Sequence, residues 1–290
     1  MIDLHLHSIK SDGLDSPSQL INKALEINLK AIALTDHDTI SGLKEFIAYG
    51  EDKDIIVIPG IEFSIRNEPE RELKDVQIIG LNIDGDSTKL NKSLQNQLKG
   101  RLEQKEAICN RLKKEFGYDI NFDDVKSLAK NSVVGRPHIV EVMRKNNPIL
   151  TQGISNDSLF KMISVGGEAF VERTVEITLE DSIDLIKSVG GIPILAHPGI
   201  YEVSNRVKFI ELCVDNGLEG IEIEYPYAKN RPFYNTEQAN WAQEFFPNFY
   251  HKIAEKYNLK ESGGSDYHGG KKGIHIGEAK VPDKYLKNYI

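Results

Sequence analysis

Histidine and acidic residues of this 290-residue chain gather in short polar segments that follow apolar runs. The first such segment, DLHLHSIKSDG, contains His5, His7 and Asp12. Side chains alternate between the two faces of a strand, so His5 and His7 project the same way, about 7 Å apart along the chain. Two imidazoles on one face can chelate a metal ion, although a single pair also suits two ordinary polar side chains at a strand end.

The same arrangement recurs along the chain. Further ligand types follow apolar runs in the segments TDHD, PGIEF, LAHPG and GSDYH, and these are His37, Glu62, His197, Asp266 and His268. The carboxyl ends of strands in α/β barrels and open α/β sheets meet at one mouth, where active sites lie. Because carboxylates and imidazoles gathered there would bury unpaired charge, the pattern predicts bound cations.

The donor types indicate which ions would bind. Imidazole nitrogen and carboxylate oxygen without thiolate favour Zn²⁺, Mn²⁺ or Fe²⁺. There are more donors than one ion needs, so we expect at least two ions. Paired metals roughly 3.5–4 Å apart are the usual apparatus of phosphoester hydrolysis, which makes this chemistry the leading hypothesis.

The apolar runs predict the strands that position these residues. A strand is expected over Ile2 to Leu6, and further strands within AIALTDHDT, DIIVIPGIEFS and DVQIIGLNID. Their continuous hydrophobicity is typical of strands covered on both faces, as in parallel α/β sheets. GIPILAHPG and GLEGIEIEY are also expected to be strands, with helices over 205–217 and 236–257.

Capping residues mark two of the expected helix starts. Ser16 suits an N-cap, Pro17 the first helical position, and Gln19 completes a capping box. Thr178 begins a later helix in the segment TLEDSIDLIKSVG. Residues 98–171 interrupt the alternation of strand and helix with charged, helical segments, so we expect a helical insertion there and one α/β domain formed by 1–97 plus 172–290.

Composition excludes several classes of partner. A net charge of −8 argues against a protein that grips duplex nucleic acid through a basic face. No apolar run approaches the ~18 residues of a membrane span, and the start resembles no secretory signal. Cys109 and Cys213 lack CxxC spacing and are expected to be buried in a reducing cytoplasm, so we expect a cytoplasmic protein.

The motifs HLH with a following Asp12, TDHDT, GIEFS, AHPG and GSDYH occur in this order across essentially the whole chain. In these motifs the chain resembles the PHP family, named for polymerase and histidinol phosphatase. The resemblance implies a distorted (β/α)₇ TIM-like barrel whose mouth is covered by the helical insertion. It also implies two to three divalent ions, one held by His5, His7, Glu62 and Asp266, a second by Asp12, His37 and His268, and a third by Glu62 and His197.

One position departs from the family pattern. The most similar members carry a histidine where Gln77 stands, and an amide oxygen is a poor substitute for imidazole. We therefore expect two firm metal sites and a third that is weak, empty or completed by water.

The insertion, its GRPH motif and the phrase IIGLNID resemble one branch of the family. That branch contains small phosphoesterases of nucleoside 3′,5′-bisphosphates and, in some members, of the 5′ ends of short RNA. The resemblance implies that Arg136, His138 and Arg173 bind the substrate, and arginine suits phosphate because its contacts are bidentate. Asp12, His37 and His268 are expected to be catalytic, through attack on phosphorus by a metal-bound hydroxide.

Other interpretations stay open at this point. Histidinol phosphatase is a rival within the same family, although the GRPH-bearing insertion disfavours it. A non-hydrolytic nucleotide or metal sensor is a rival of another class, and Gln77 is its only sequence hint. Asp36 and Asp38, which flank His37, could orient imidazoles or serve as simple loop carboxylates.

Overall fold

A computed structural model describes residues 1–129, 134–230, 235–270 and 273–290. The chain divides into two compact units. The first, here called the barrel unit, comprises residues 1–92 and 177–290, and the second, the helical unit, comprises residues 93–176.

The barrel unit contains a seven-stranded sheet in which the strands neighbour one another in chain order. Its edges approach each other, since Leu6 bridges Tyr267 and the Asp266 N–H donates to the His5 carbonyl. The expected distorted α/β barrel is therefore confirmed, and it is nearly closed. The strands are β1 Ile2–Leu6, β2 Ala31–Leu34, β3 Ile56–Ser64, β4 Gln77–Leu81, β5 Ile192–Leu195, β6 Gly220–Glu224 and β7 Lys260–Gly263.

Strand β4 runs against its neighbours, although its continuous hydrophobicity is typical of strands in parallel sheets. It pairs antiparallel with both β3 and β5, while the other neighbouring pairs within the sheet are parallel. The segment between Ser64 and Gln77 forms only a 3₁₀ helix over Pro69–Arg71 and an isolated bridge. A parallel return would need a crossover, usually a helix, which this segment does not provide. The reversal places Gln77 opposite Ser64, at the same rim as the carboxyl ends of the other strands.

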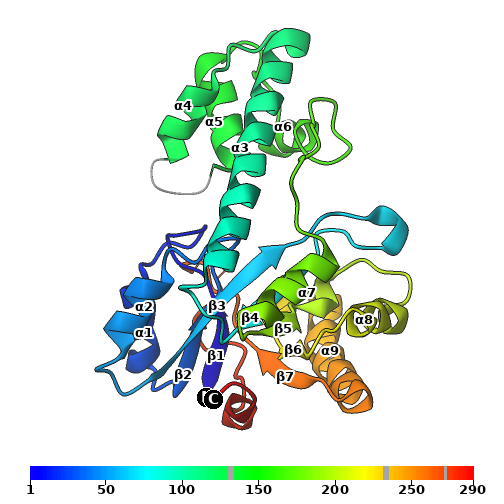
Figure 1. The fold of residues 1–290 in the computed structure, drawn as a ribbon. Helices are drawn as coiled ribbons and strands as arrows, with labels where there is room; N and C mark the ends of the chain where they lie inside the picture. The colour runs from blue at the N-terminus through cyan, green and yellow to red at the C-terminus, as the bar shows by residue number, and fades with distance from the viewer. Residues whose placement is uncertain (130–133, 231–234, 271–272) are drawn as a thin grey trace. The chain divides into compact units, whose positions relative to one another are not determined.

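Helices surround the strands of the barrel unit (Figure 1). α1 and α2 lie beside β2 and β3, α7 lies beside β4 and β5, and α9 lies beside β6 and β7. The predicted Ser16 capping box and Thr178 N-cap are both confirmed. The helices are α1 Pro17–Glu26, α2 Leu43–Gly50, α7 Leu179–Ser188, α8 Arg206–Asp215 and α9 Thr236–Tyr257.

The strands of the barrel unit contribute buried side chains to an apolar core. It includes Ile2, Leu4, Ala33, Ile79 and Ile194, all of which are buried. Leu4 lies between His5 and Asp3, so the alternation of β1 places leucine in this core and His5 and His7 together at another face.

The helical unit has a core of its own, formed by residues such as Ile108, Leu112, Val125, Ile139 and Met143. It contains most of α3 Thr88–Phe116, together with α4 Phe122–Ala129, α5 Arg136–Asn146 and α6 Asn156–Met162.

Two smaller expectations concern cysteines and membranes. Cys109 and Cys213 are both buried and unpaired, as predicted. Within the described ranges, the helices are too short or too polar to traverse a bilayer.

Candidate metal centre

The rim of the barrel unit brings together all eight residues that the sequence nominates as metal ligands. They form three overlapping groups of donor atoms, and within each group the atoms lie within 4.8 Å of one another. The first group is His7, Asp12, His37 and His268, the second is His5, His7 and Asp266, and the third is His5, Glu62 and His197.

The first group is the most exposed of the three. Asp12 Oδ1 lies 3.2 Å from His268 Nε2 and 3.8 Å from His37 Nε2. The His7 ring stacks against both His37 and His268, with ring centroids 4.3 and 4.1 Å away. The Asp12 side chain is 55% exposed, whereas His7 is fully buried. This group therefore forms the solvent side of the centre.

The second and third groups share His5. Its Nε2 atom lies 3.0 Å from His7 Nε2, 3.6 Å from Asp266 Oδ1 and 3.4 Å from Glu62 Oε1. Glu62 Oε1 is in turn 3.2 Å from His197 Nε2. Since His5, His7, and Glu62 are inaccessible to solvent, these groups form the inner side of the centre.

Gln77 borders the centre at His37. Its Nε2 atom lies 3.2 Å from His37 Nδ1. The reversal of β4 explains this position, because it brings the first residue of that strand to the rim. The amide therefore contacts a candidate ligand of the first group.

Electrostatic coupling within the cluster separates the protonation states of neighbouring imidazoles. Burial, reinforced by the charges of His268 and His37, lowers the pKa of His7 to about 3. Burial acts the same way on His37, but the charge of Glu62 outweighs it and raises the pKa of His37 to about 9. The histidines hold the pKa of Glu62 well below its usual range despite its burial. His7 is thus neutral and Glu62 ionised at neutral pH, the forms that bind metal ions.

The donor atoms fit divalent cations. His7 Nδ1, His197 Nδ1 and Glu62 Oε2 are buried and form no hydrogen bond with the described residues. Glu62 Oε2 nevertheless lies 2.9 Å from His37 Nδ1 and 3.4 Å from His7 Nε2. Buried polar atoms are normally hydrogen-bonded, so a buried carboxylate oxygen that lies among imidazole nitrogens without a hydrogen bond, as Glu62 Oε2 does, fits the role of a cation ligand. Oxygen and imidazole donors suit Mn²⁺, Fe²⁺ or Zn²⁺.

The backbone at this rim adopts conformations that side chains rarely take. Three non-glycine residues here have positive φ: Asp38 at 50°, His197 at 26° and Asp266 at 54°. Such conformations cost about 1–3 kcal/mol each and cluster at functional sites, where the surrounding contacts enforce them. The fold therefore holds two candidate ligands, His197 and Asp266, in strained geometry.

Comparison with known proteins agrees with this centre. Residues 3–173 match the model of the PHP domain. The chain belongs to the PHP domain family. It is thus a metal-dependent phosphoesterase, a hydrolase of phosphoester bonds.

Among the relatives of this PHP protein, a 5′-3′ exoribonuclease of Haemophilus influenzae is 30% identical and covers 92% of this chain and 89% of its own. A 3′,5′-nucleoside bisphosphate phosphatase of Chromobacterium violaceum is 28% identical, with 96% and 91% covered. A solved structure from Bifidobacterium adolescentis, provisionally assigned as a metal-dependent phosphoesterase, has a TM-score of 0.74 at 23% identity, with 99% and 94% covered. This last likeness supports the fold.

The predicted substrate contacts of the PHP protein lie in the helical unit. Arg136 is exposed and donates to Ser164 Oγ at 2.8 Å. His138 Nδ1 accepts the Gly135 N–H at 3.0 Å, which leaves Nε2 as the protonated nitrogen of the neutral ring. The Arg173 side chain is 15% exposed and lies 3.6 Å from Glu176.

Lys105 and Arg101, which the sequence analysis did not nominate, belong to the same basic cluster. Burial first, then the charges of Arg173, Arg101 and Arg136, lower the pKa of Lys105 to about 7. A buried amine that responds to three guanidinium groups marks a concentrated positive potential. The spacing of these residues in the sequence does not predict the cluster, because Lys105 comes close to Arg173 only in the folded chain.

Asp36 serves the loop that carries Asp12. Its carboxylate accepts hydrogen bonds from the Ser8 N–H and hydroxyl, both at 2.7 Å, and from the Ser11 hydroxyl at 2.6 Å. Asp38 accepts from the Ser64 N–H at 2.9 Å. Of the two roles considered for these residues, the contacts support that of loop carboxylates.

Two further residues of the centre, Glu222 and Tyr225, were also missed. Glu222 is fully buried, and its carboxylate lies 3.2 Å from His5 Nδ1. Tyr225 donates to Asp266 Oδ2 at 2.8 Å. An acidic residue inside the apolar strand GIEIE was the available signal for Glu222.

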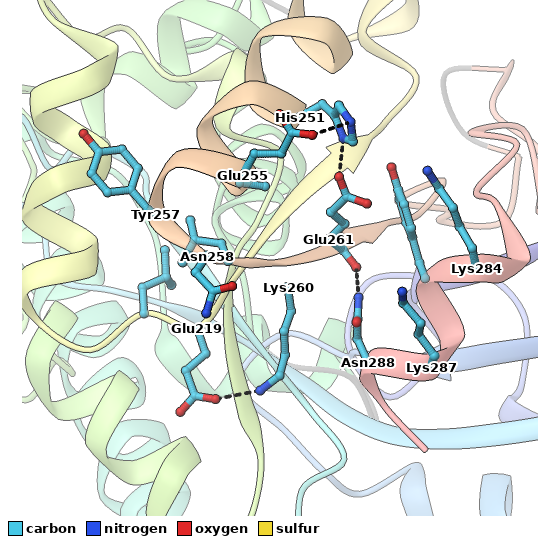
Figure 2. A pocket seen from close by; sticks show the side chains of 14 residues that line it. Glu219, His251, Glu255, Tyr257, Asn258, Lys260, Glu261, Lys284, Lys287 and Asn288 are labelled. Carbon is cyan, nitrogen blue, oxygen red and sulfur yellow. Dashed lines mark hydrogen bonds and ion pairs between the residues drawn. The ribbon is translucent and has the colours of Figure 1, made fainter.

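The remaining histidines lie outside the centre. His251 contacts Glu261 in a pocket at the amino ends of β6 and β7, away from the ligand-bearing rim (Figure 2). In that pocket Lys260 pairs with Glu219 at 2.9 Å. His275 is exposed. Lys271 and Lys272, whose charges could attract phosphate, are outside the described residues.

Proposed function

We propose that this PHP protein hydrolyses phosphomonoesters of small nucleotides, removing the 3′-phosphate of nucleoside 3′,5′-bisphosphates. One observation carries the proposal: the chain has two separate sets of groups suited to phosphate, the metal centre of the barrel unit and the basic cluster of the helical unit. A bisphosphate has one phosphate for each. The similarity to a 3′,5′-nucleoside bisphosphate phosphatase supports the same substrate class.

In this proposal the eight candidate ligands hold two to three divalent ions. When bound, such ions polarise phosphate oxygens and lower the pKa of a coordinated water toward ~7. The exposed first group would meet the substrate, so Asp12, His37 and His268 are the proposed catalytic residues. His268 Nδ1 lies 2.8 Å from the Asp266 carbonyl oxygen and donates to it, which aims Nε2 toward Asp12.

Water is the proposed nucleophile. Burial raises the pKa of Cys109 and of Cys213 to about 12, so neither thiol ionises readily enough to attack phosphorus. The reaction would therefore be a direct displacement, with the charge of the phosphate compensated at the centre.

The basic cluster would hold the 5′-phosphate that stays on the product. Arg136 and Arg173 provide planar donor pairs that match phosphate oxygens, and His138 presents its Nε2 proton. Lys105 adds charge when an anion binds.

Phosphate release from adenosine 3′,5′-bisphosphate by the Mn²⁺-loaded protein tests the substrate. We expect rapid release of one phosphate, leaving 5′-AMP, and slow release from 5′-AMP and histidinol phosphate. Equal rates on all three would contradict recognition of the second phosphate, and preference for histidinol phosphate would favour that rival.

Variants of the basic cluster separate recognition from chemistry. Arg136→Met should raise the KM for the bisphosphate about tenfold or more, because a charged hydrogen bond is lost, while hydrolysis of p-nitrophenyl phosphate stays unchanged. Lys145→Met, on the same helix α5, is the matched control. An unchanged KM in Arg136→Met would remove the cluster from the proposal.

Short RNA with a 5′-phosphate is the second candidate substrate, favoured by the similarity to the 5′-3′ exoribonuclease. Release of mononucleotides from a 5′-phosphorylated trinucleotide, without activity on the bisphosphate, would support it. Binding of nucleotide and metal without turnover on either substrate would indicate a sensor.

A further inference from the structure

Strand β6 and the residue that follows it contribute none of the eight candidate ligands, yet together they contact three of them. Glu222, inside the strand, reaches His5 and the backbone of His197. Tyr225, which follows the strand directly, reaches Asp266. We infer that Glu222 and Tyr225 are positioning residues that determine how His5, His197 and Asp266 present their donor atoms to metal ions, an inference that rests on the metal centre of the proposed function.

Glu222 determines which nitrogen of His5 faces the centre. Both of its oxygens lie beside His5 Nδ1, at 3.2 and 3.3 Å. A carboxylate only accepts hydrogen bonds, so Nδ1 donates and carries the proton. The other nitrogen, Nε2, faces the remaining donors, 3.0 Å from His7 Nε2, and is the atom left to bind a metal ion. A carboxylate bonded to the far nitrogen of a ligating imidazole fixes its orientation and increases its basicity.

The same carboxylate holds the strained peptide of His197. Glu222 Oε2 accepts the His197 N–H at 2.7 Å, where φ is 26°. One buried side chain thus connects candidate ligands from β1 and from the end of β5. Because one carboxylate makes both contacts, removing it would free the ring of His5 and the strained backbone of His197 together.

Tyr225 selects the oxygen that Asp266 presents. Its hydroxyl donates to Oδ2 at 2.8 Å and so occupies that oxygen. The other oxygen, Oδ1, lies 3.3 Å from His7 Nε2 and 3.4 Å from His268 Nδ1, among the donor atoms of the centre. The hydrogen bond therefore favours coordination through Oδ1 alone.

Tyr225→Phe tests the second contact, and Tyr227→Phe is its matched control. Tyr227 is buried with its ring centroid 5.1 Å from that of Tyr225, and its hydroxyl forms no hydrogen bond to the eight candidates in the described structure. Metal content and affinity would be measured by elemental analysis and chelator competition with Mn²⁺. We expect about a tenfold or greater loss of affinity in Tyr225→Phe and none in Tyr227→Phe. Equal affinities in the two variants would overturn the role of Tyr225.

Glu222→Gln and Glu222→Ala test the first contact. The metal-free protein, with ¹⁵N-labelled histidine, reports the hydrogen bond of His5 Nδ1 by NMR. We expect an Nδ1 proton held in a hydrogen bond in the wild type, with that bond retained in Glu222→Gln through the amide oxygen and lost in Glu222→Ala. Metal affinity should fall in the order wild type, Gln, Ala. Glu224→Gln, on the same strand, is the control and should match the wild type.

An unaltered signal of His5 Nδ1 and unaltered affinity in Glu222→Ala would overturn the role of Glu222. Should Glu222→Ala not fold, the Gln variant still decides the matter, since a purely structural carboxylate would leave its affinity for Mn²⁺ unchanged. These readouts need no substrate. A wild-type protein that binds Mn²⁺ but hydrolyses no bisphosphate would contradict the proposed substrate and leave this inference standing, whereas a wild type that binds no Mn²⁺ would refute both.

Discussion

The Nε2 atoms of His5 and His7 lie 3.0 Å apart at the end of the first strand, where the two side chains project from the same face. The structure records a hydrogen bond between them, but a carboxylate stands within 3.4 Å of each. Two imidazole nitrogens and two Glu62 oxygens surround one point, and such a set of atoms suits a bound metal cation better than a shared proton. The behaviour of this pair is therefore the first subject for mutation.

His7→Ala should abolish turnover while leaving the fold intact. His7 belongs to two of the three donor groups, so its loss removes a donor from both. We expect a rate loss of about a thousandfold, equivalent to about 4 kcal/mol of transition-state stabilisation. Steady-state kinetics would measure it, with circular dichroism to check the fold. Asp12→Ala should behave alike, and a wild-type rate in either variant would refute the metal assignment.

Gln77→His should increase metal binding. The residue stands at the rim, 3.2 Å from His37, and imidazole is a better donor than an amide oxygen for Zn²⁺ or Mn²⁺. We expect the metal content of the dialysed protein to rise by up to one ion per chain, measured by elemental analysis. Gln77→Ala should leave the content unchanged. A content that stays constant in both variants would show that position 77 does not limit the third site.

Lys105→Met should stabilise the protein and weaken substrate binding. The pKa of Lys105 is about 7 in the folded protein and about 10.4 when unfolded, so between these values the unfolded chain binds more protons. The lysine therefore makes the free energy of unfolding increase with pH in this window. At pH 7 nearly all of the destabilisation by the buried amine is present. Removing it should raise the melting temperature by about 2–4 °C per kcal/mol recovered.

Calorimetry of nucleotide binding would test the same residue. A bound phosphate should raise the pKa of Lys105, so binding at pH 8 should take up a proton, seen as a dependence of the binding enthalpy on buffer ionisation. Lys105→Met should remove this uptake. Lys113→Met, exposed on the same helix, should change neither melting temperature nor proton uptake. A melting temperature for Lys105→Met below that of the wild type would contradict the assignment.

Gly264→Ala should damage the centre through His5. An added Cβ would lie 2.2 Å from the Cβ of His5 and 2.5 Å from its backbone nitrogen, distances that real contacts do not reach. We expect lower stability and reduced affinity for Mn²⁺, because His5 must move. Gly85→Ala is the control, since its nearest neighbour is the flexible side chain of Leu43 at 3.2 Å. Wild-type affinity in Gly264→Ala would show that the centre tolerates this shift.

The sequence alone determined the barrel and the ligand types at its rim. Apolar runs followed by His37, Glu62 or His197 identify strand ends, and the carboxyl ends of barrel strands converge whatever the details of packing. The caps at Ser16 and Thr178 were also predictable, because capping depends on neighbours three residues apart. Such features are local, and a chain displays them before it folds.

Tertiary structure decided the direction of β4, the residues that position the ligands and the basic cluster. His5 and Glu222 are 217 positions apart, and no periodicity links them. The same holds for Lys105 and Arg173, since the charge of Arg173 lowers the pKa of Lys105 only once the two residues come close in the folded chain. The antiparallel course of β4 depends on the absence of a crossover helix, which the apolar run of that strand does not reveal. Contacts between distant segments form only when the core closes, so only the folded chain shows them.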